Sequence, residues 1–238
     1  MKVTLFVPCF VDQLYPDAAM AMVRVIERLG HTVDFREELL CCGQPAFNAG
    51  YWPEARSVAE RLLLGLSDAE VVVIGSGSCG AMLRVFNLEL FEGTPLHGAA
   101  RDLAGKTFEF SEFLVHKLGI TDVGARFDGT VTFHDGCHGL RELRIKDAPR
   151  QLLRQVRGLR LVEMADSETC CGFGGTFSVK FPSISVGMGQ TKLESIRAAD
   201  AEYVVSNDLS CLMHLAGLAG KQGRSIRALH LAEVLVRT

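Results

Sequence analysis

The sequence predicts an α/β protein made of two pseudo-symmetric βα repeats, each with a small, mostly parallel sheet flanked by helices. Short apolar segments alternate with amphipathic ones along the 238 residues, as parallel βαβ units require. The eight cysteines fall into two similar spacings, C-x31-CC-x36-C and C-x32-CC-x39-C, with a glycine after each adjacent pair. Residues 68–79 are echoed by residues 200–211 at a constant offset of 132. These observations together indicate a duplicated fold.

The first half predicts four strand and helix units. Residues 3–7 and 71–74 are short apolar runs of the kind that forms buried parallel strands. Residues 17–29 predict a helix, because their apolar side chains recur at helical spacing on one face. The other elements follow the same two rules, with strands at 32–35 and 107–110 and helices at 52–64, 79–90 and 111–118.

The second half repeats this order after a joint near residues 124–129, where two glycines interrupt the pattern. The expected strands are 130–134, 159–164, 203–206 and 226–229, and the expected helices are 147–156, 182–198, 211–218 and the C-terminal residues. We therefore expect one repeat over residues 1–125 and a second over residues 126–238.

Composition and charge exclude several classes of partner. A hydrophobic content of 48% is enough for a sizeable core without disulfides. A net charge of −3, with no block of basic residues, argues against binding to nucleic acid. No apolar run approaches the roughly 20 residues that span a bilayer, and Pro8, Cys9 and Asp12 interrupt the apolar N-terminus, unlike a signal peptide. We expect a cytoplasmic protein without a membrane span.

Each cysteine lies where a predicted strand ends. In the first half, Cys9, the pair Cys41 and Cys42, and Cys79 follow successive strands. Parallel strands end at the same edge of a sheet, so these four thiols should converge, one set per repeat. Adjacent Cα atoms lie about 3.8 Å apart, closer than the roughly 4.4 Å at which disulfides begin, so the paired cysteines should not bond to each other. The second set is Cys137, Cys170, Cys171 and Cys211.

The thiols predict which metals can bind. In a cytosolic protein, eight cysteines indicate metal or redox chemistry rather than a disulfide framework. Soft thiolates select zinc or an iron–sulfur cluster. Directly adjacent cysteines fit two neighbouring irons better than one zinc ion. We therefore expect all eight cysteines to be metal ligands for up to two 4Fe-4S clusters, with zinc as the alternative occupant of one site.

The segments around the cysteines resemble a known family. LFVPC, CCGQPAFNAGY, CHGLREL, CCGFGGTFSVK and CLMHLAG resemble the CCG-domain iron–sulfur proteins, which include the CCG-domain component of heterodisulfide reductase and the glycolate oxidase iron–sulfur subunit, and are similar to the lactate utilization protein A family. The resemblance covers essentially the whole chain. It implies an iron–sulfur oxidoreductase subunit that transfers electrons while acting with lactate utilization proteins B and C in the oxidation of L-lactate to pyruvate.

The chain departs from the CCG pattern at two positions. That pattern ends each repeat in C-x2-C, whereas Ser76 and Asp208 stand where the first of these cysteines belongs. Each repeat thus offers four thiolates, which suffice for a conventional four-iron cluster but put the noncubane cluster of heterodisulfide reductase in doubt. We hypothesise that Ser76 and Asp208 supply oxygen ligands or hydrogen bonds to the cluster.

Other polar residues lie near the cysteines. His134, His138 and His214 are expected to be hydrogen-bond partners rather than ligands. Arg141 and Arg144 suggest a clamp for the carboxylate of a small 2-hydroxy acid. No side chain is identified as catalytic.

Two other functions remain open from the sequence. A structural zinc site would make the chain an assembly scaffold, and adjacent cysteines could instead carry out thiol–disulfide chemistry or electron transfer, as the resemblance to heterodisulfide reductase and glycolate oxidase implies.

Overall fold

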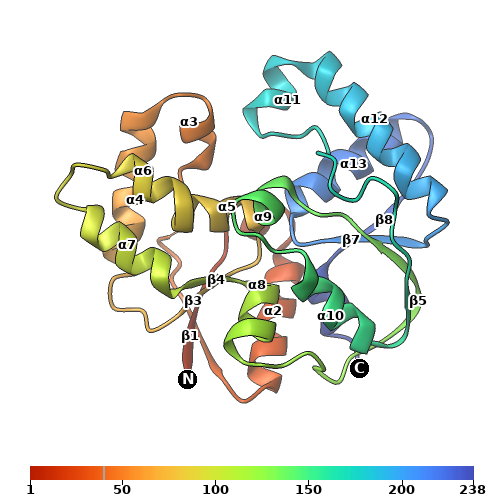
Figure 1. Cartoon of the computed structure of the whole chain (residues 1–238), viewed down its shortest axis with the longest axis horizontal. Helices are drawn as coiled ribbons and strands as arrows, with labels where there is room; N and C mark the ends of the chain where they lie inside the picture. Colours follow the sequence, from red (N-terminus) through yellow and green to blue (C-terminus); the bar gives the residue numbers. More distant parts are fainter. Residues whose placement is uncertain (40) are drawn as a thin grey trace.

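A computed structural model describes residues 1–39 and 41–238 and confirms the predicted α/β class. It contains two four-stranded sheets flanked by helices (Figure 1). Every strand pair is parallel. The strand order is β2-β1-β3-β4 in the first sheet and β6-β5-β7-β8 in the second. The identical order confirms two pseudo-symmetric repeats.

The strands lie close to their predicted positions. The first sheet contains β1 (Lys2–Phe6), β2 (Thr32–Phe35), β3 (Val72–Ile74) and β4 (Thr107–Glu109). The second contains β5 (Arg126–Phe133), β6 (Arg157–Leu161), β7 (Tyr203–Ser206) and β8 (Arg227–His230). Strand β5 begins inside the predicted joint, because Arg126 already pairs with Arg157 of β6. Gly129 marks an irregular register within β5 rather than a break in the strand.

The long helices also follow the sequence. Three of them begin with a proline at their first or second position, where its missing N–H costs nothing. The helices of eight or more residues are α2 (Pro16–Arg28), α4 (Trp52–Gly65), α7 (His97–Lys106), α10 (Asp147–Gln155), α12 (Pro182–Ala198) and α13 (Leu209–Lys221). Of these, α7 was not predicted from the sequence, because its glycines and polar residues weaken the helical pattern.

Several shorter segments differ from the prediction. The expected helix over 79–90 is divided into α5 (Gly77–Ala81), a π-helical turn η1 (Met82–Phe86) and α6 (Asn87–Leu90). The expected helix over 111–118 consists of α8 (Phe110–Glu112) and a second π-helical turn, η2 (Phe113–Lys117). Four short helices next to cysteines were expected as loops: α1 (Cys9–Leu14), α3 (Gln44–Asn48), α9 (Cys137–Arg141) and α11 (Thr176–Lys180). The C-terminal helix is α14 (Leu231–Leu235).

The main hydrophobic core runs through both repeats. One cluster contains Val3 and Val73 from the first sheet together with Val131 and Val205 from the second. A separate cluster packs Val72 and the opposite face of the first sheet against α4, η1 and α7. Helix α14 packs on α2 of the other repeat. Helix α8 packs on α10 (Figure 1). Within the described ranges, no helix is both long and apolar enough to cross a bilayer.

Candidate metal centre

The cysteines of the first repeat follow the ends of three strands. Cys9 begins α1 directly after β1, Cys41 and Cys42 lie between β2 and α3, and Cys79 lies in α5 after β3. Because these strands are parallel, the three connections meet at one edge of the sheet.

The second repeat places its cysteines in the same way. Cys137 begins α9 after β5, Cys170 and Cys171 lie between β6 and α11, and Cys211 lies in the first turn of α13 after β7. The short helices α5 and α9, one from each repeat, pack against each other at the centre of the molecule (Figure 1). Since they carry Cys79 and Cys137, this contact brings the two cysteine sets together.

Both sets face the same cavity. All eight cysteines line a single cavity of about 230 Å³, together with Phe10, Phe173, His138 and Asp208. The sequence predicts one point of convergence per repeat, but the spacing within each repeat does not determine how the repeats face each other. The shared cavity is therefore a finding of the structure.

The glycine after each cysteine pair has a structural reason. Gly43 and Gly172 have φ angles of 86° and 90°, a region that favours glycine. Their backbone N–H groups donate to the sulfurs of Cys41 and Cys170, both at 3.4 Å. A side chain on Gly172 would also place its Cβ 2.5 Å from the carbonyl oxygen of Ser185. The CCG sequence thus turns the chain and directs a backbone donor toward a sulfur.

The thiols of the first set lie close enough to share protons. The sulfurs of Cys42 and Cys79 are 3.1 Å apart. Contact with Cys42, followed by burial, raises the pKa of Cys79 well above its usual value. Contact with Cys9 lowers the pKa of Cys41 to about 6. One thiolate therefore forms at the expense of its neighbours, and complete ionisation of the set calls for a compensating cation.

The second set behaves in the same way. Contacts with Cys137 and then Cys171 lower the pKa of Cys170 to about 2. Contacts with Cys170 and Cys211, followed by burial, raise the pKa of Cys171. All eight cysteines are free thiols. Clustered soft donors that can be ionised together only beside positive charge fit a thiolate-bound metal centre.

The three histidines occupy different environments. His138 lines the cavity, and its Nδ1 lies 3.8 Å from the sulfur of Cys137. His214 lies with its Nε2 3.4 Å from the Ser185 hydroxyl. His134 is fully buried at the end of β5, and burial, with the charge of Lys192 as a smaller cause, lowers its pKa to about 3. Buried in this way, the His134 ring is neutral at neutral pH.

Lys192 is a buried cation that the sequence analysis did not identify. It lies on the inner face of α12 and is fully buried. Its ammonium group donates to the backbone carbonyls of Asp166 and Ser167, and its burial lowers its pKa. Helical spacing could have predicted its burial. Lys192 lies on the same face of the helix as the buried Ser185, Gly189 and Ile196.

The two positions that depart from the CCG pattern contact each other across the repeats. The Ser76 hydroxyl donates to Oδ1 of Asp208 at 3.0 Å, and the Ser78 N–H donates to the same oxygen at 3.2 Å. Asp208 also lines the cavity. Their role as metal ligands stays a prediction. Arg141 and Arg144 are exposed and lie outside the cavity lining, so the structure does not support a carboxylate clamp there.

Comparisons with known proteins agree with the duplicated site. The CCG family, described as a cysteine-rich domain, matches residues 3–84 and again 131–216. Lactate utilization protein A of Geobacillus kaustophilus is 46% identical over 236 residues, covering 99% of this chain and 98% of that protein. The protein of the same name from Geobacillus thermodenitrificans is 44% identical with the same coverage.

A solved structure shares the fold. The crystal structure of a hypothetical protein from Helicobacter pylori is 10% identical and superposes with a TM-score of 0.67, covering 99% of this chain and 48% of that chain. At this identity the likeness concerns the fold alone.

Proposed function

Because this chain belongs to the cysteine-rich CCG family and is related over its whole length to lactate utilization protein A, we propose that it is an iron–sulfur subunit of a system that oxidises L-lactate to pyruvate. Its own step in this proposal is electron transfer. The observation that carries the proposal is the convergence of all eight cysteines on one cavity.

The side chains around the thiols suit electron transfer. A bound iron–sulfur cluster supplies one-electron redox chemistry. The eight cysteines would hold it, and the N–H groups of Gly43, Gly172 and Phe173 already donate to cysteine sulfurs. Such donors stabilise negative charge on sulfur, while the rings of Phe10 and Phe173 keep water away. With two cysteine sets on one cavity, electrons need cross only a short distance between the repeats.

The partners follow from the family. We propose that lactate utilization proteins B and C complete the system and that this chain works with them in the cytoplasm. The arginines suited to hold a carboxylate lie outside the cavity. We therefore place the binding and oxidation of lactate on a partner rather than on the cysteine cavity.

Anaerobic purification followed by iron and sulfide analysis tests the proposal. We expect about four irons and four sulfides per cysteine set. Cys42→Ser and Cys171→Ser should each remove one set, so that each variant keeps roughly half of the iron. Exposed Ser67→Ala, away from the cavity, serves as the matched control and should keep all of it. A colourless protein that holds zinc instead would contradict the proposal and support a scaffold.

One contact favours a second function. The 3.1 Å separation of the Cys42 and Cys79 sulfurs also suits thiol–disulfide exchange. That function predicts activity that survives iron chelation, whereas electron transfer through clusters predicts loss of activity together with the iron.

A further inference from the structure

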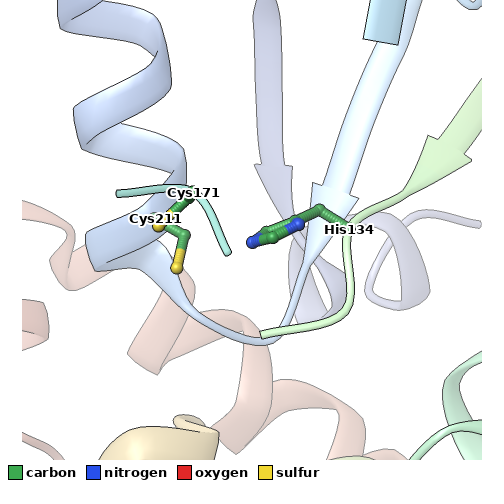
Figure 2. A group of neighbouring side chains, drawn as sticks. All are labelled: His134, Cys171 and Cys211. Carbon is green, nitrogen blue, oxygen red and sulfur yellow. The ribbon is translucent and has the colours of Figure 1, made fainter. Parts of the chain in front are cut away.

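His134 faces the second cysteine set from the opposite side of the site. It follows the last residue of β5, whereas Cys171 comes from the connection before α11 and Cys211 from the start of α13. Figure 2 shows the imidazole ring directed toward the two cysteine side chains. One ring nitrogen and the two sulfurs all lie within 4.8 Å of one another. Three potential ligand atoms from separate segments thus surround a common point.

The His134 ring has no well-formed hydrogen bond to the described part of the chain. His134 is 0% exposed, and neither Nδ1 nor Nε2 has a hydrogen-bond partner of normal geometry in residues 1–39 and 41–238. The ring lies near the backbone of Ser167 but does not make a hydrogen bond of normal geometry with it. Leaving a buried polar group unpaired destabilises the folded state. Histidines that are buried for structural reasons satisfy at least one nitrogen, as His230 does with the Gly75 carbonyl at 3.1 Å. The unpaired ring of His134 therefore points to a ligand beyond the protein's own atoms.

The duplicated fold shows that packing alone does not require a histidine here. The cysteines that follow β1 and β5 are Cys9 and Cys137. The residue three positions before this cysteine is Phe6 in the first repeat and His134 in the second. Phe6 is the last residue of β1, and His134 directly follows β5. Phe6 is buried in an ordinary hydrophobic cluster. An apolar ring fills this place in one repeat, so the histidine of the other has a different role.

We propose that His134 is a metal ligand that supplies a nitrogen donor to the centre of the second repeat, together with Cys171 and Cys211. The identity of that centre as an iron–sulfur cluster rests on the proposed function, but the ligand role of His134 does not. The first repeat is then an all-thiolate site, and the second is a mixed nitrogen and sulfur site.

The proposed ligand makes the two centres chemically different. Where the neutral imidazole takes the place of one thiolate on an iron, the centre carries less negative charge, which favours the reduced state. The buried ammonium of Lys192 lies near the same cysteines and acts in the same direction. The second repeat is therefore the better electron acceptor of the two.

Electron spin-echo spectroscopy of the reduced protein tests the ligand directly. Protein labelled with ¹⁵N only in histidine should show the coupling of a nitrogen bound to the paramagnetic centre. His134→Phe, which installs the residue of the first repeat, should lose this coupling. His214→Phe is the matched control, since the His214 ring contacts Ser185 rather than the sulfurs, and it should keep the coupling. A coupling that is absent from the wild type, or that persists in His134→Phe, would overturn the proposal.

Cobalt(II) binding to the metal-free protein gives a readout that does not depend on iron. We expect His134→Phe to weaken binding at the second site by at least about tenfold and to shift the ligand-field bands toward a sulfur-only set. His134→Gln serves as a second variant should the phenylalanine fail to fold. Unchanged cobalt affinity and bands in a folded variant would overturn the ligand role. Absence of iron and sulfide from the wild type would instead refute the proposed function, and the cobalt result would still decide the role of His134.

Discussion

Buried charged residues lie beside the second cysteine set. Arg150 donates to both carboxylate oxygens of the buried Asp135, each at 2.8 Å, and also to Glu163 at 2.8 and 3.0 Å. The position of Asp135 relative to Cys137 corresponds to the buried Val7 next to Cys9. The two parallel hydrogen bonds between Arg150 and Asp135 compensate the cost of burying both charges. Near-identical folds thus give the two cysteine sets different electrostatic surroundings.

Glu109 is a buried acid whose protonation should govern stability. It is 0% exposed at the end of β4, and burial raises its pKa from 4.5 to about 8. Its Oε2 accepts hydrogen bonds from the N–H groups of Ser111 and Glu112, while Oε1 has no partner in the described part of the chain. The folded state therefore holds a proton that the unfolded state releases above about pH 4.5. Stability should fall as pH rises from about 4.5 to 8.

Glu109→Gln should remove this dependence, because the amide stays neutral and keeps an acceptor oxygen. We expect Tm values similar to the wild type near pH 5 and higher than the wild type near pH 8, a difference of roughly a few kcal/mol in unfolding free energy. Thermal unfolding of both proteins across this range measures it. Exposed Glu60→Gln is the control and should follow the wild type. Parallel profiles for Glu109→Gln and the wild type would show that Glu109 does not hold the proton.

At the scale of elements, the last strand–helix unit of each repeat joins the two repeats. The His230 ring at the start of α14 accepts from the Ala232 N–H through Nδ1, so Nε2 carries the proton. It donates to the Gly75 carbonyl of the first repeat at 3.1 Å. In the first repeat, the hydroxyl of Ser111 in α8 accepts a hydrogen bond from the side-chain amide of Asn207 of the second repeat at 3.2 Å. Each repeat thus packs one helix against the other repeat, α14 on α2 and α8 on α10, and adds a polar contact beside it.

The contact between α5 and α9 depends on a glycine. A Cβ on Gly77 would lie 2.7 Å from the Cα of Gly139 and 2.9 Å from Oδ2 of Asp208. Because the nearest atom belongs to the backbone, the two helices would have to separate. We expect Gly77→Ala to destabilise the protein by about 1–3 kcal/mol, measured as a lower Tm.

The matched control for this variant is Gly217→Ala in α13. Gly217 is exposed, and nothing lies within 4 Å of a Cβ placed there. Alanine at this helical position should stabilise the protein by about 0.5–1 kcal/mol. If both variants had the same Tm as the wild type, the close approach of α5 and α9 would not be a constraint.

The sequence predicted the elements that are long or strongly apolar. Residues 71–74 and 182–198 were identified because an apolar run or a start with proline separates them from their surroundings. The short helices α1, α3, α9 and α11 were missed, because five or six residues do not show a helical period. The π-helical turns at 82–86 and 113–117 were missed as well, since their sequences resemble those of α-helices.

At the scale of the whole molecule, the sequence placed the cysteines at strand ends but not around one cavity. The position of each cysteine after a strand can be read from local spacing, and parallel strands end at one edge of the sheet. The convergence of both cysteine sets on one cavity depends on how the repeats pack, and this packing includes contacts such as that of Ser76 with Asp208. For the same reason, the approach of His134 to Cys171 and Cys211 could not be predicted from their separation in sequence.

The repeats also share their main core. Arg28 of α2 donates to the carbonyl of Val123 at 3.3 Å and to that of Leu235 at 3.1 Å, so it ties the N-terminal repeat to the end of the chain. Val25 and Ile26 of the same helix are buried in the cluster that also contains Val234. Separating the repeats would expose these apolar surfaces to water.

We therefore expect residues 1–125 and 126–238, produced separately, to remain unfolded or to aggregate, and to recover native structure when they are produced together. The intact chain should unfold in one calorimetric transition, with equal calorimetric and van't Hoff enthalpies. Two separate transitions, or dispersed amide NMR signals from either fragment alone, would contradict this prediction. A shared core would also explain how one cavity can receive cysteines from both repeats, because neither half of the cavity wall is then stable without the other.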